Sequence, residues 1–364
     1  MDPAALAARL EAIEQRFAGS DAERRAAQLC ADELRRGGRE PRTETLWFRP
    51  QVHGPRAVFA AVGVAASVVA VSHHVVGLAL AGGALLATLL DAARVRLLAP
   101  LLARRATQNV IAPPSRHRDG DVLLILSASA DAPGRSIISR LERLRRGSLL
   151  PGAAGLLLVA LALVAACAGA RVAGAGGTAL GVVQLVPTAA LILLVGAFAE
   201  AALARPAPRA PAGGPAVALA VALALDAQPP RHLAVEVLVA GAGEAGAAGM
   251  AAYVRARRRG VRPEDVVVVH LGSSPGTVRY LARDGESFGA RLHPRLVQLA
   301  GAVPGTERLQ GRGRSGARVA RGARWPAIGL EGDARPLAAA TLRLVAAIDA
   351  DLRTARQATS GDAG

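Results

Sequence analysis

The segment LAVEVLVAGAGEAG, from Leu233 to Gly246, decides the fold class. Its first part, Leu233–Ala240, is apolar apart from one glutamate, as expected for a strand that is buried on both faces of a sheet. The glycine-rich run Gly241–Gly246 then predicts a tight turn, and the helical stretch Ala245–Arg259 follows it. A buried strand that turns directly into a helix is typical of α/β proteins.

Similar strands and helices are predicted on both sides of this segment. Further strand-like runs lie at Thr43–Phe48, Gln108–Ala112, Val122–Ser127, Val266–Leu271 and Ala327–Leu330. Helical runs lie at Met1–Arg16, Ser20–Arg36, Arg135–Arg146, Ala216–Leu225 and Leu337–Arg353, and a disordered tail is expected at 355–364. The pattern predicts an α/β three-layer sandwich with a mixed, mostly parallel sheet.

The start of the second helix carries a capping signal, Ser20-Asp21-Ala22-Glu23. In a capping box, the Ser20 hydroxyl accepts the N–H of Glu23, and the Glu23 carboxylate accepts the N–H of Ser20. The helix is expected to end at Gly37-Gly38, since glycine readily adopts the conformation that closes a helix.

Two long apolar stretches, Ala57–Leu90 and Leu149–Leu203, predict two transmembrane helical hairpins, and the second is interrupted near Arg171 and the run Gly174–Gly177. In the second stretch, Leu149–Ala170 and Thr178–Leu203 each have the roughly 20 residues that a bilayer crossing requires. In the first, Ser72-His73-His74 leaves two segments of about 24 Å, short of a hydrocarbon core of roughly 30 Å. Two crossings are favoured there, and a re-entrant hairpin is the alternative.

Two hairpins, 56–91 and 149–204, leave the polar segments 1–55, 92–148 and 205–354 on one side of the membrane, where they can form one α/β domain. Arginines that flank the spans on that side outnumber those on the other, where Arg171 lies. The positive-inside rule therefore places the domain in the cytoplasm, at the plasma membrane of a bacterium. The flanking arginines are Arg56, Arg94, Arg96, Arg104, Arg105, Arg145, Arg146, Arg205 and Arg209.

Composition supports a lipid bilayer as a partner and argues against nucleic acid. The chain is 52% hydrophobic with a mean hydropathy of +0.31, which is high for a soluble protein. Its net charge of +16 comes from arginines that are scattered, and only two Trp and two Tyr could stack on bases. Cys30 and Cys167 lie in a soluble helix and a predicted span, so no disulfide framework is expected.

The turn Gly241–Gly246 matches the G-x-G-x-x-G pattern of dinucleotide-binding proteins. That fingerprint also needs an acid at the end of the next strand, to hold the ribose. Here Val266–Leu271 runs into Gly272, and its nearest acids precede it. A glycine-rich structural turn is therefore the main interpretation, and dinucleotide binding is an alternative.

Gly272-Ser273-Ser274-Pro275-Gly276 matches the G-x-S-x-G elbow of hydrolases. The oxyanion hole of those enzymes uses the N–H of the residue after the nucleophile, and Pro275 has none. We therefore expect a strand-end turn. No metal-ligand spacing connects the histidines, which are His53, His73, His74, His117, His232, His270 and His293.

Read in order, the elements resemble the zinc-dependent aminopeptidases of the aminopeptidase Y and bacterial leucyl aminopeptidase type, the clan MH metallopeptidases. Four segments carry the resemblance: Phe17–Ala27 with Glu33-Leu34 and Gly38, Gln108–Ala112 with Val122–Ser127, Leu238–Tyr253, and Ser315–Leu330. The resemblance implies the fold of that family, with its mixed sheet, and a site for two zinc ions at the ends of the strands.

The same resemblance implies that the catalytic machinery is lost. Ser129 stands at the family's histidine ligand, and Asp131 is the retained acid of that motif. Gly243 and Glu244 stand at the family's Glu-Glu pair, so the general base is replaced by glycine and one ligand is retained.

Two further ligand positions of the family hold Gly272 and Gly316, and no histidine follows His293. Residues 206–215, where the family's bridging aspartate would fall, contain no acid. Because a zinc site normally needs at least three protein ligands, neither zinc nor another cofactor is expected.

The sequence therefore predicts an integral membrane pseudopeptidase with no catalytic residues and a binding or scaffolding role toward a peptide or protein partner. The positions that match the family's site would line its pocket. A divergent metal-dependent hydrolase, using Glu244 and Asp131 or a ligand from another subunit, is the enzymatic alternative. Dinucleotide binding at Gly241–Gly246 is the second alternative.

Overall fold

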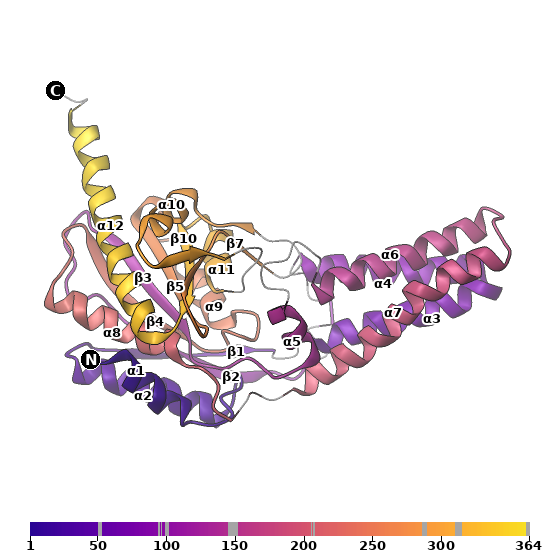
Figure 1. Cartoon of the computed structure of the whole chain (residues 1–364), viewed down its shortest axis with the longest axis horizontal. Helices are drawn as coiled ribbons and strands as arrows, with labels where there is room; N and C mark the ends of the chain where they lie inside the picture. The colour runs from indigo at the N-terminus through magenta and orange to yellow at the C-terminus, as the bar shows by residue number, and fades with distance from the viewer. Residues whose placement is uncertain are drawn as a thin grey trace.

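In the computed structural model, an α/β domain carries a long four-helix bundle on one side (Figure 1). The structure describes residues 1–49, 53–93, 95, 97–98, 102–144, 152–204, 206, 208–285, 290–309 and 315–361. The first and last helices, α1 (Pro3–Glu11) and α12 (Ala334–Gly361), both belong to the α/β domain.

A mixed, mostly parallel sheet of eight strands forms the centre of the domain, as predicted. The strand order is β1-β2-β4-β3-β5-β10-β6-β9, and β4, β3, β5 and β10 form a parallel centre. The strands are β1 (Arg42–Phe48), β2 (Arg105–Ala112), β3 (Val122–Ser129), β4 (Leu233–Ala240), β5 (Val266–Ser273), β6 (Val278–Leu281), β9 (Thr306–Arg308) and β10 (Ala327–Gly332). A separate two-stranded sheet pairs β7 (Arg283–Asp284) with β8 (Ala290–Arg291).

Helices cover both faces of the sheet and give three layers (Figure 1). One apolar core joins the sheet to α1, α2 (Asp21–Arg36), α8 (Gly213–Ala227), α10 (Pro294–Ala302) and α12. The core on the other face includes α9 (Ala248–Arg257) and α11 (Ala317–Gly322), and a 3-10 turn, Pro263–Asp265, precedes β5. Apolar residues along both faces of the central strands explain why those strands read as continuous hydrophobic runs.

Several elements differ in extent from the prediction. α1 ends at Glu11 rather than near Arg16, whose side chain is buried under the sheet edge. α12 continues as helix to Gly361, whereas a disordered tail was expected from residue 355. Residues 354–359 contain neither Gly nor Pro, so nothing in the sequence ends the helix earlier. The short strands β6 to β9 were not predicted, because runs of two to four mixed residues show no periodicity.

The bundle consists of α3 (His53–Ser72), α4 (His74–Ala92), α6 (Ala153–Val172) and α7 (Thr178–Leu203). All four helices are long and apolar enough to cross a membrane. α3 has 20 residues, about 30 Å of helix, and is therefore longer than its uncharged segment predicted. The extra length includes Arg56, which forms an ion pair of 3.2 Å with Asp91 on α4.

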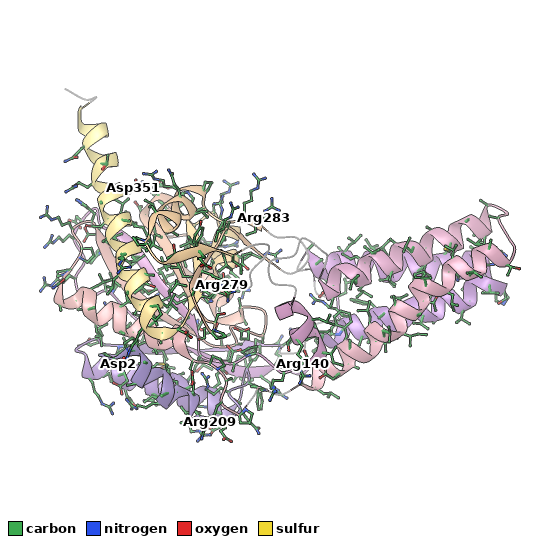
Figure 2. All side chains as sticks on the ribbon, viewed as in Figure 1. Asp2, Arg140, Arg209, Arg279, Arg283 and Asp351 are labelled. Atoms are coloured by element: carbon green, nitrogen blue, oxygen red, sulfur yellow. The ribbon has the colours of Figure 1, made fainter. Side chains whose placement is uncertain are left out.

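The side chain of Arg56 is only 10% exposed and is paired near the start of α3. Arg94, Arg96, Arg145, Arg146 and Arg205 lie outside the described residues. Across the bundle, the buried Gln184 of α7 donates to the carbonyl and hydroxyl oxygens of Ser67 on α3, at 2.7 and 2.8 Å. The outer surface is apolar, with Val68, Leu185, Val186 and Leu193 all more than 60% exposed (Figure 2).

The chain passes between domain and bundle at one edge of the sheet. β1 ends at Phe48 shortly before α3, and β3 ends at Ser129 before α5 (Ile137–Leu144) and α6. β2 returns from α4 and begins at Arg105, antiparallel to β4. This edge therefore holds the carboxyl ends of β3 and β4, and it faces the bundle (Figure 1). Carboxyl ends of parallel strands are where α/β proteins usually place their sites.

Candidate functional site

The carboxylate of Asp131 forms the centre of the candidate site, two residues beyond the end of β3. It is buried, and its Oδ1 accepts the backbone N–H of Gly243 at 2.7 Å. Its Oδ2 accepts the N–H of Glu244 at 3.0 Å. Three of the predicted positions, Asp131, Gly243 and Glu244, are therefore brought together. The retained acid is engaged with the backbone of the turn that follows β4.

The other N–H groups of this turn are also bound by side chains. Gly241 donates to Oδ1 of Asn109 on β2 at 3.1 Å, and Ala242 donates to Oε1 of Glu23 at 2.6 Å. With the two bonds to Asp131, each N–H from Gly241 to Glu244 has an acceptor within the protein. A phosphate-binding turn instead directs these groups at its ligand. α9 also begins at Ala248, later than the predicted Ala245.

Glu23 is a site residue that the sequence did not identify. Its carboxylate is 1% exposed and accepts the N–H of Gly19 at 2.6 Å and the hydroxyl of Thr107 at 2.8 Å, besides the N–H of Ala242. The predicted capping box is therefore half right. Ser20 does accept the N–H of Glu23 at 3.0 Å, but the N–H of Ser20 donates to the carbonyl of Phe17.

The signal that could have found Glu23 is the same spacing that predicted the cap. An acid three residues after a capping serine fits the capping-box pattern. Only the tertiary structure brings β2 and the turn after β4 close enough to donate hydrogen bonds to the oxygens of this acid. Glu23 therefore ties the start of α2 to the candidate site.

Gly243, which the sequence resemblance predicts to replace a general base, lies directly against Ser129. A Cβ added at Gly243 would be 2.0 Å from the Ser129 hydroxyl oxygen and 2.5 Å from its Cβ. Real Cβ atoms do not make such contacts, so a side chain at residue 243 would require Ser129 to move. Ser129 therefore occupies the space that a side chain at residue 243 would need. The position that would hold the base has no space for a side chain.

The other two glycines at predicted site positions, Gly316 and Gly272, differ in how much space surrounds them. A Cβ at Gly316 would be 2.9 Å from Nδ1 of His270, so Gly316 packs tightly on this buried ring. A Cβ at Gly272, near the end of β5, would meet Glu331 at an ordinary 3.5 Å. There is therefore space for a side chain at Gly272 on β5, but not at Gly316, which immediately precedes α11. His270 itself is a packed strand residue, and burial lowers its pKa to about 4.

The buried carboxylates influence one another. Burial raises the pKa of Asp131 well above its usual range, and the charges of Glu23 and Glu244 raise it further. Burial also raises the pKa of Glu23. The guanidinium of Arg16 is buried close by, where it donates to the carbonyl oxygens of Ala130 at 3.2 Å and Ala210 at 2.7 Å. Its charge partly compensates that of Asp131.

The residues present do not fit a zinc ion. Of the six matched positions, only Asp131 and Glu244 carry a group that binds metal, and zinc sites use three or four such ligands. The Asp131 oxygens are moreover directed at two backbone N–H groups. In the part of the chain that the structure describes, no group of three or more His, Cys, Asp or Glu side chains could hold a metal ion.

The G-x-S-x-G segment forms a turn after β5. Ser274 is buried, and its hydroxyl accepts a hydrogen bond from Arg279 at 2.6 Å. Gly276 has a φ of +92°, which favours glycine. His293 immediately precedes α10 and is followed by Pro294. These features agree with the predicted strand-end turn.

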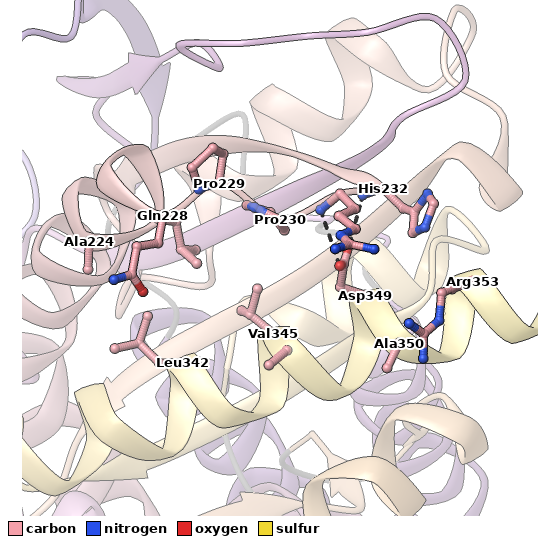
Figure 3. Close-up of a pocket in the computed structure, with 13 residues that line it drawn as sticks. Ala224, Gln228, Pro229, Pro230, His232, Leu342, Val345, Asp349, Ala350 and Arg353 are labelled. Carbon is pink, nitrogen blue, oxygen red and sulfur yellow. Dashed lines mark hydrogen bonds between the residues drawn. The ribbon is translucent and has the colours of Figure 1, made fainter.

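A cavity of about 430 Å³ lies between the end of α8 and α12 (Figure 3). His232, which lines the cavity, immediately precedes β4, so the cavity lies at the amino ends of the parallel strands. Asp131 lies at the opposite edge of the sheet, where β3 and β4 end; we call this the Asp131 edge. None of the six matched positions lines it. Asp349 in its wall accepts the backbone N–H groups of Arg231 and His232, at 3.2 and 2.7 Å.

Comparison with known proteins gives structural similarity alone. No family model matches the chain, and no curated protein matches it. A glutaminyl cyclase from Fimbriiglobus ruber is 11% identical, with a TM-score of 0.49 over 96% of this chain and 94% of that one. A zinc aminopeptidase from Bacillus subtilis is 12% identical, with a TM-score of 0.47 over 92% and 85% of the two chains.

A Zn-dependent exopeptidase from Parabacteroides distasonis is 10% identical, with a TM-score of 0.47 over 96% of each chain. The similar structures thus include zinc-dependent exopeptidases and glutaminyl cyclases. At these identities and TM-scores, no activity of theirs is transferred to this chain.

Proposed function

We propose that this chain is an integral membrane pseudopeptidase, whose α/β domain binds a peptide or protein partner and does not hydrolyse peptides. The observation that carries the proposal is the contact between Gly243 and Ser129, which fills the space that a general base would need. Asp131, the retained acid, supports this interpretation because its oxygens hold the turn at Gly243 and Glu244. The polar groups at this edge thus stabilise the fold.

The membrane assignment is supported by the surface of the bundle. Val68, Leu185, Val186 and Leu193 expose more than 60% of their area on helices of about 30 Å or more. In water such a surface would be costly, whereas in a bilayer it is solvated by lipid chains. The α/β domain then lies on the side from which both hairpins enter, and we propose the cytoplasmic side.

A divergent hydrolase remains the alternative from the enzyme class. It would use Glu244 and Asp131, or a metal ligand supplied by another subunit. The hydrogen bonds of Asp131 count against this alternative, because a metal would have to compete with two backbone donors for the same oxygens. Dinucleotide binding is weakened in the same way, since the turn's N–H groups are already bound, and absence of a thermal shift with dinucleotides would eliminate it.

Activity measurements test the proposal. Detergent-purified protein, with and without added zinc, is incubated with a panel of aminoacyl chromogenic substrates and dipeptides. We expect no turnover above that of a heat-denatured sample. Hydrolysis that disappears in Glu244→Gln and persists in the exposed-residue control Glu264→Gln would overturn the proposal.

A further inference from the structure

The short helix α5 (Ile137–Leu144) lies where the domain meets the bundle (Figure 1). Its Ile138 is 1% exposed and packs in the same apolar cluster as Leu157 and Phe198 of the bundle. Ile137 and Leu141, one turn apart, are instead 52% and 46% exposed. Residues four apart share a helix face, so α5 uses one face to pack on the bundle and presents an apolar ridge to its surroundings.

Other large apolar side chains are exposed at the same edge. Val95 and Leu97, each 50% exposed, lie in the connection from α4 to β2. Trp47 is 68% exposed and sits at the end of β1, six residues before α3. Val95 and Leu97 therefore lie between a bundle helix and the sheet, and Trp47 lies at the end of β1 that leads to α3.

Arginines accompany these apolar residues. Arg104 and Arg105 are exposed at the start of β2, and Arg135 and Arg140 are exposed before and within α5. Arg140 lies beside the base of the bundle (Figure 2). A helix with one apolar and one basic face lies in the interface of a membrane with its apolar side toward the acyl chains. Tryptophan favours the same level, and arginine attracts anionic headgroups.

We propose that α5, Trp47, Val95 and Leu97 form an interfacial surface that seats the Asp131 edge of the domain on an anionic phospholipid bilayer. The inference rests on the proposed membrane span of the bundle and adds a defined contact between domain and lipid. The four exposed arginines contact lipid phosphates, and the Ile137–Leu141 ridge and Trp47 enter the upper acyl region. The candidate site then faces the membrane surface.

The two tryptophans of the chain permit a direct test. Trp47 is exposed, whereas Trp325 is 1% exposed in the domain core, so each can be studied after the other is replaced by Phe. The full chain is reconstituted into phosphatidylcholine–phosphatidylglycerol vesicles whose acyl chains carry bromine near the headgroup. In Trp325→Phe, we expect the fluorescence of Trp47 to fall about twofold relative to unbrominated lipid. In Trp47→Phe, the remaining Trp325 serves as the control and is expected to be unchanged.

A second readout reports on α5. In a background with Cys30→Ala and Cys167→Ala, an environment-sensitive dye is attached at Leu141→Cys, and at Arg353→Cys on α12 as the control. We expect the emission of the dye at residue 141 to shift to the blue in vesicles, and that at residue 353 to remain as in water. Replacing phosphatidylglycerol by phosphatidylcholine is expected to reduce the shift, because the arginines lose their anionic partners.

Carbonate extraction of the same vesicles separates this inference from the membrane span. Protein that stays in the vesicles while Trp47 is unquenched and residue 141 is aqueous would overturn the interfacial surface and leave the span intact. Protein that is released by carbonate would overturn the span, and the interfacial surface with it.

Discussion

The Oδ1 atom of Asp131 accepts the backbone N–H of Gly243 at 2.7 Å, across the gap between the ends of β3 and β4. The sequence resemblance predicts that these two positions correspond to a catalytic centre. Here they bind each other, with Ser129 filling the space beside them. The carboxylate of Asp131 thereby holds the glycine-rich turn after β4 in place.

Removal of the Asp131 carboxylate should destabilise the domain. Asp131→Ala leaves two partly buried N–H groups of the turn without their acceptor, at a cost of about 1–2 kcal/mol for each. We expect the free energy of unfolding in detergent to fall by roughly 2–4 kcal/mol, measured by urea titration. Asp265→Ala, at an exposed position before β5, is the matched control and should change it by less than about 0.5 kcal/mol. Equal effects of the two variants would contradict this role of Asp131.

A side chain at Gly243 should be destabilising until Ser129 is reduced. The added Cβ of Gly243→Ala would meet Ser129 at 2.0 Å, and overpacking typically costs about 1–3 kcal/mol. The double variant Gly243→Ala with Ser129→Gly should recover part of this loss, as a double-mutant cycle would measure. Gly322→Ala, where an added Cβ meets nothing within 4 Å, is the control. Simple additivity in the cycle would show that the two residues do not compete for the same space.

The central parallel strands could be predicted from the sequence because each is buried on both faces and reads as a continuous apolar run. Val266–Leu271 and Leu233–Ala240 are examples, and both were found within two residues of their ends. The loss of a zinc site at Gly243 and Gly316 stays a prediction, which rests on the fact that a glycine side chain supplies no ligand. The role of Glu23 could not, because its partners Thr107 and Ala242 are remote in sequence. The pairing of Arg56 with Asp91 escaped prediction for the same reason.

The buried Asp284 should make stability depend on pH. Burial raises its pKa from 3.8 to about 6, so the folded protein binds this proton more tightly than the unfolded chain does. The resulting stabilisation is fully present below pH 3.8 and is lost as the pH rises through about 6. It amounts to roughly 3 kcal/mol.

Asp284→Asn removes this group from the titration. The difference in melting temperature between the two proteins should therefore change between pH 4 and pH 7, with the parent losing stability relative to the variant as the pH rises. Thermal melts in detergent across this range test it. Parallel melting curves for parent and variant would contradict the assigned pKa.

The ion pair between Arg56 and Asp91 should stabilise the first hairpin. Both side chains are about one-tenth exposed, so Asp91→Asn leaves a charge in the bundle at a cost of about 3–5 kcal/mol. The double variant Arg56→Gln with Asp91→Asn should be less destabilised than Asp91→Asn alone. Asp21→Asn, which breaks an exposed pair with Arg25 at 3.4 Å, is the control and should cost less than about 1 kcal/mol. If Asp91→Asn lowers the free energy of unfolding no more than Asp21→Asn does, the buried pair does not stabilise the hairpin.

Metal content tests the central claim most directly. The protein is purified in detergent, equilibrated with zinc, freed of unbound metal by gel filtration, and analysed for zinc per chain by elemental analysis. The lost ligands and the engaged Asp131 predict far less than one zinc per chain, unchanged by Glu244→Gln. One or two zinc ions per chain, reduced by Glu244→Gln or by Asp131→Asn, would contradict the account.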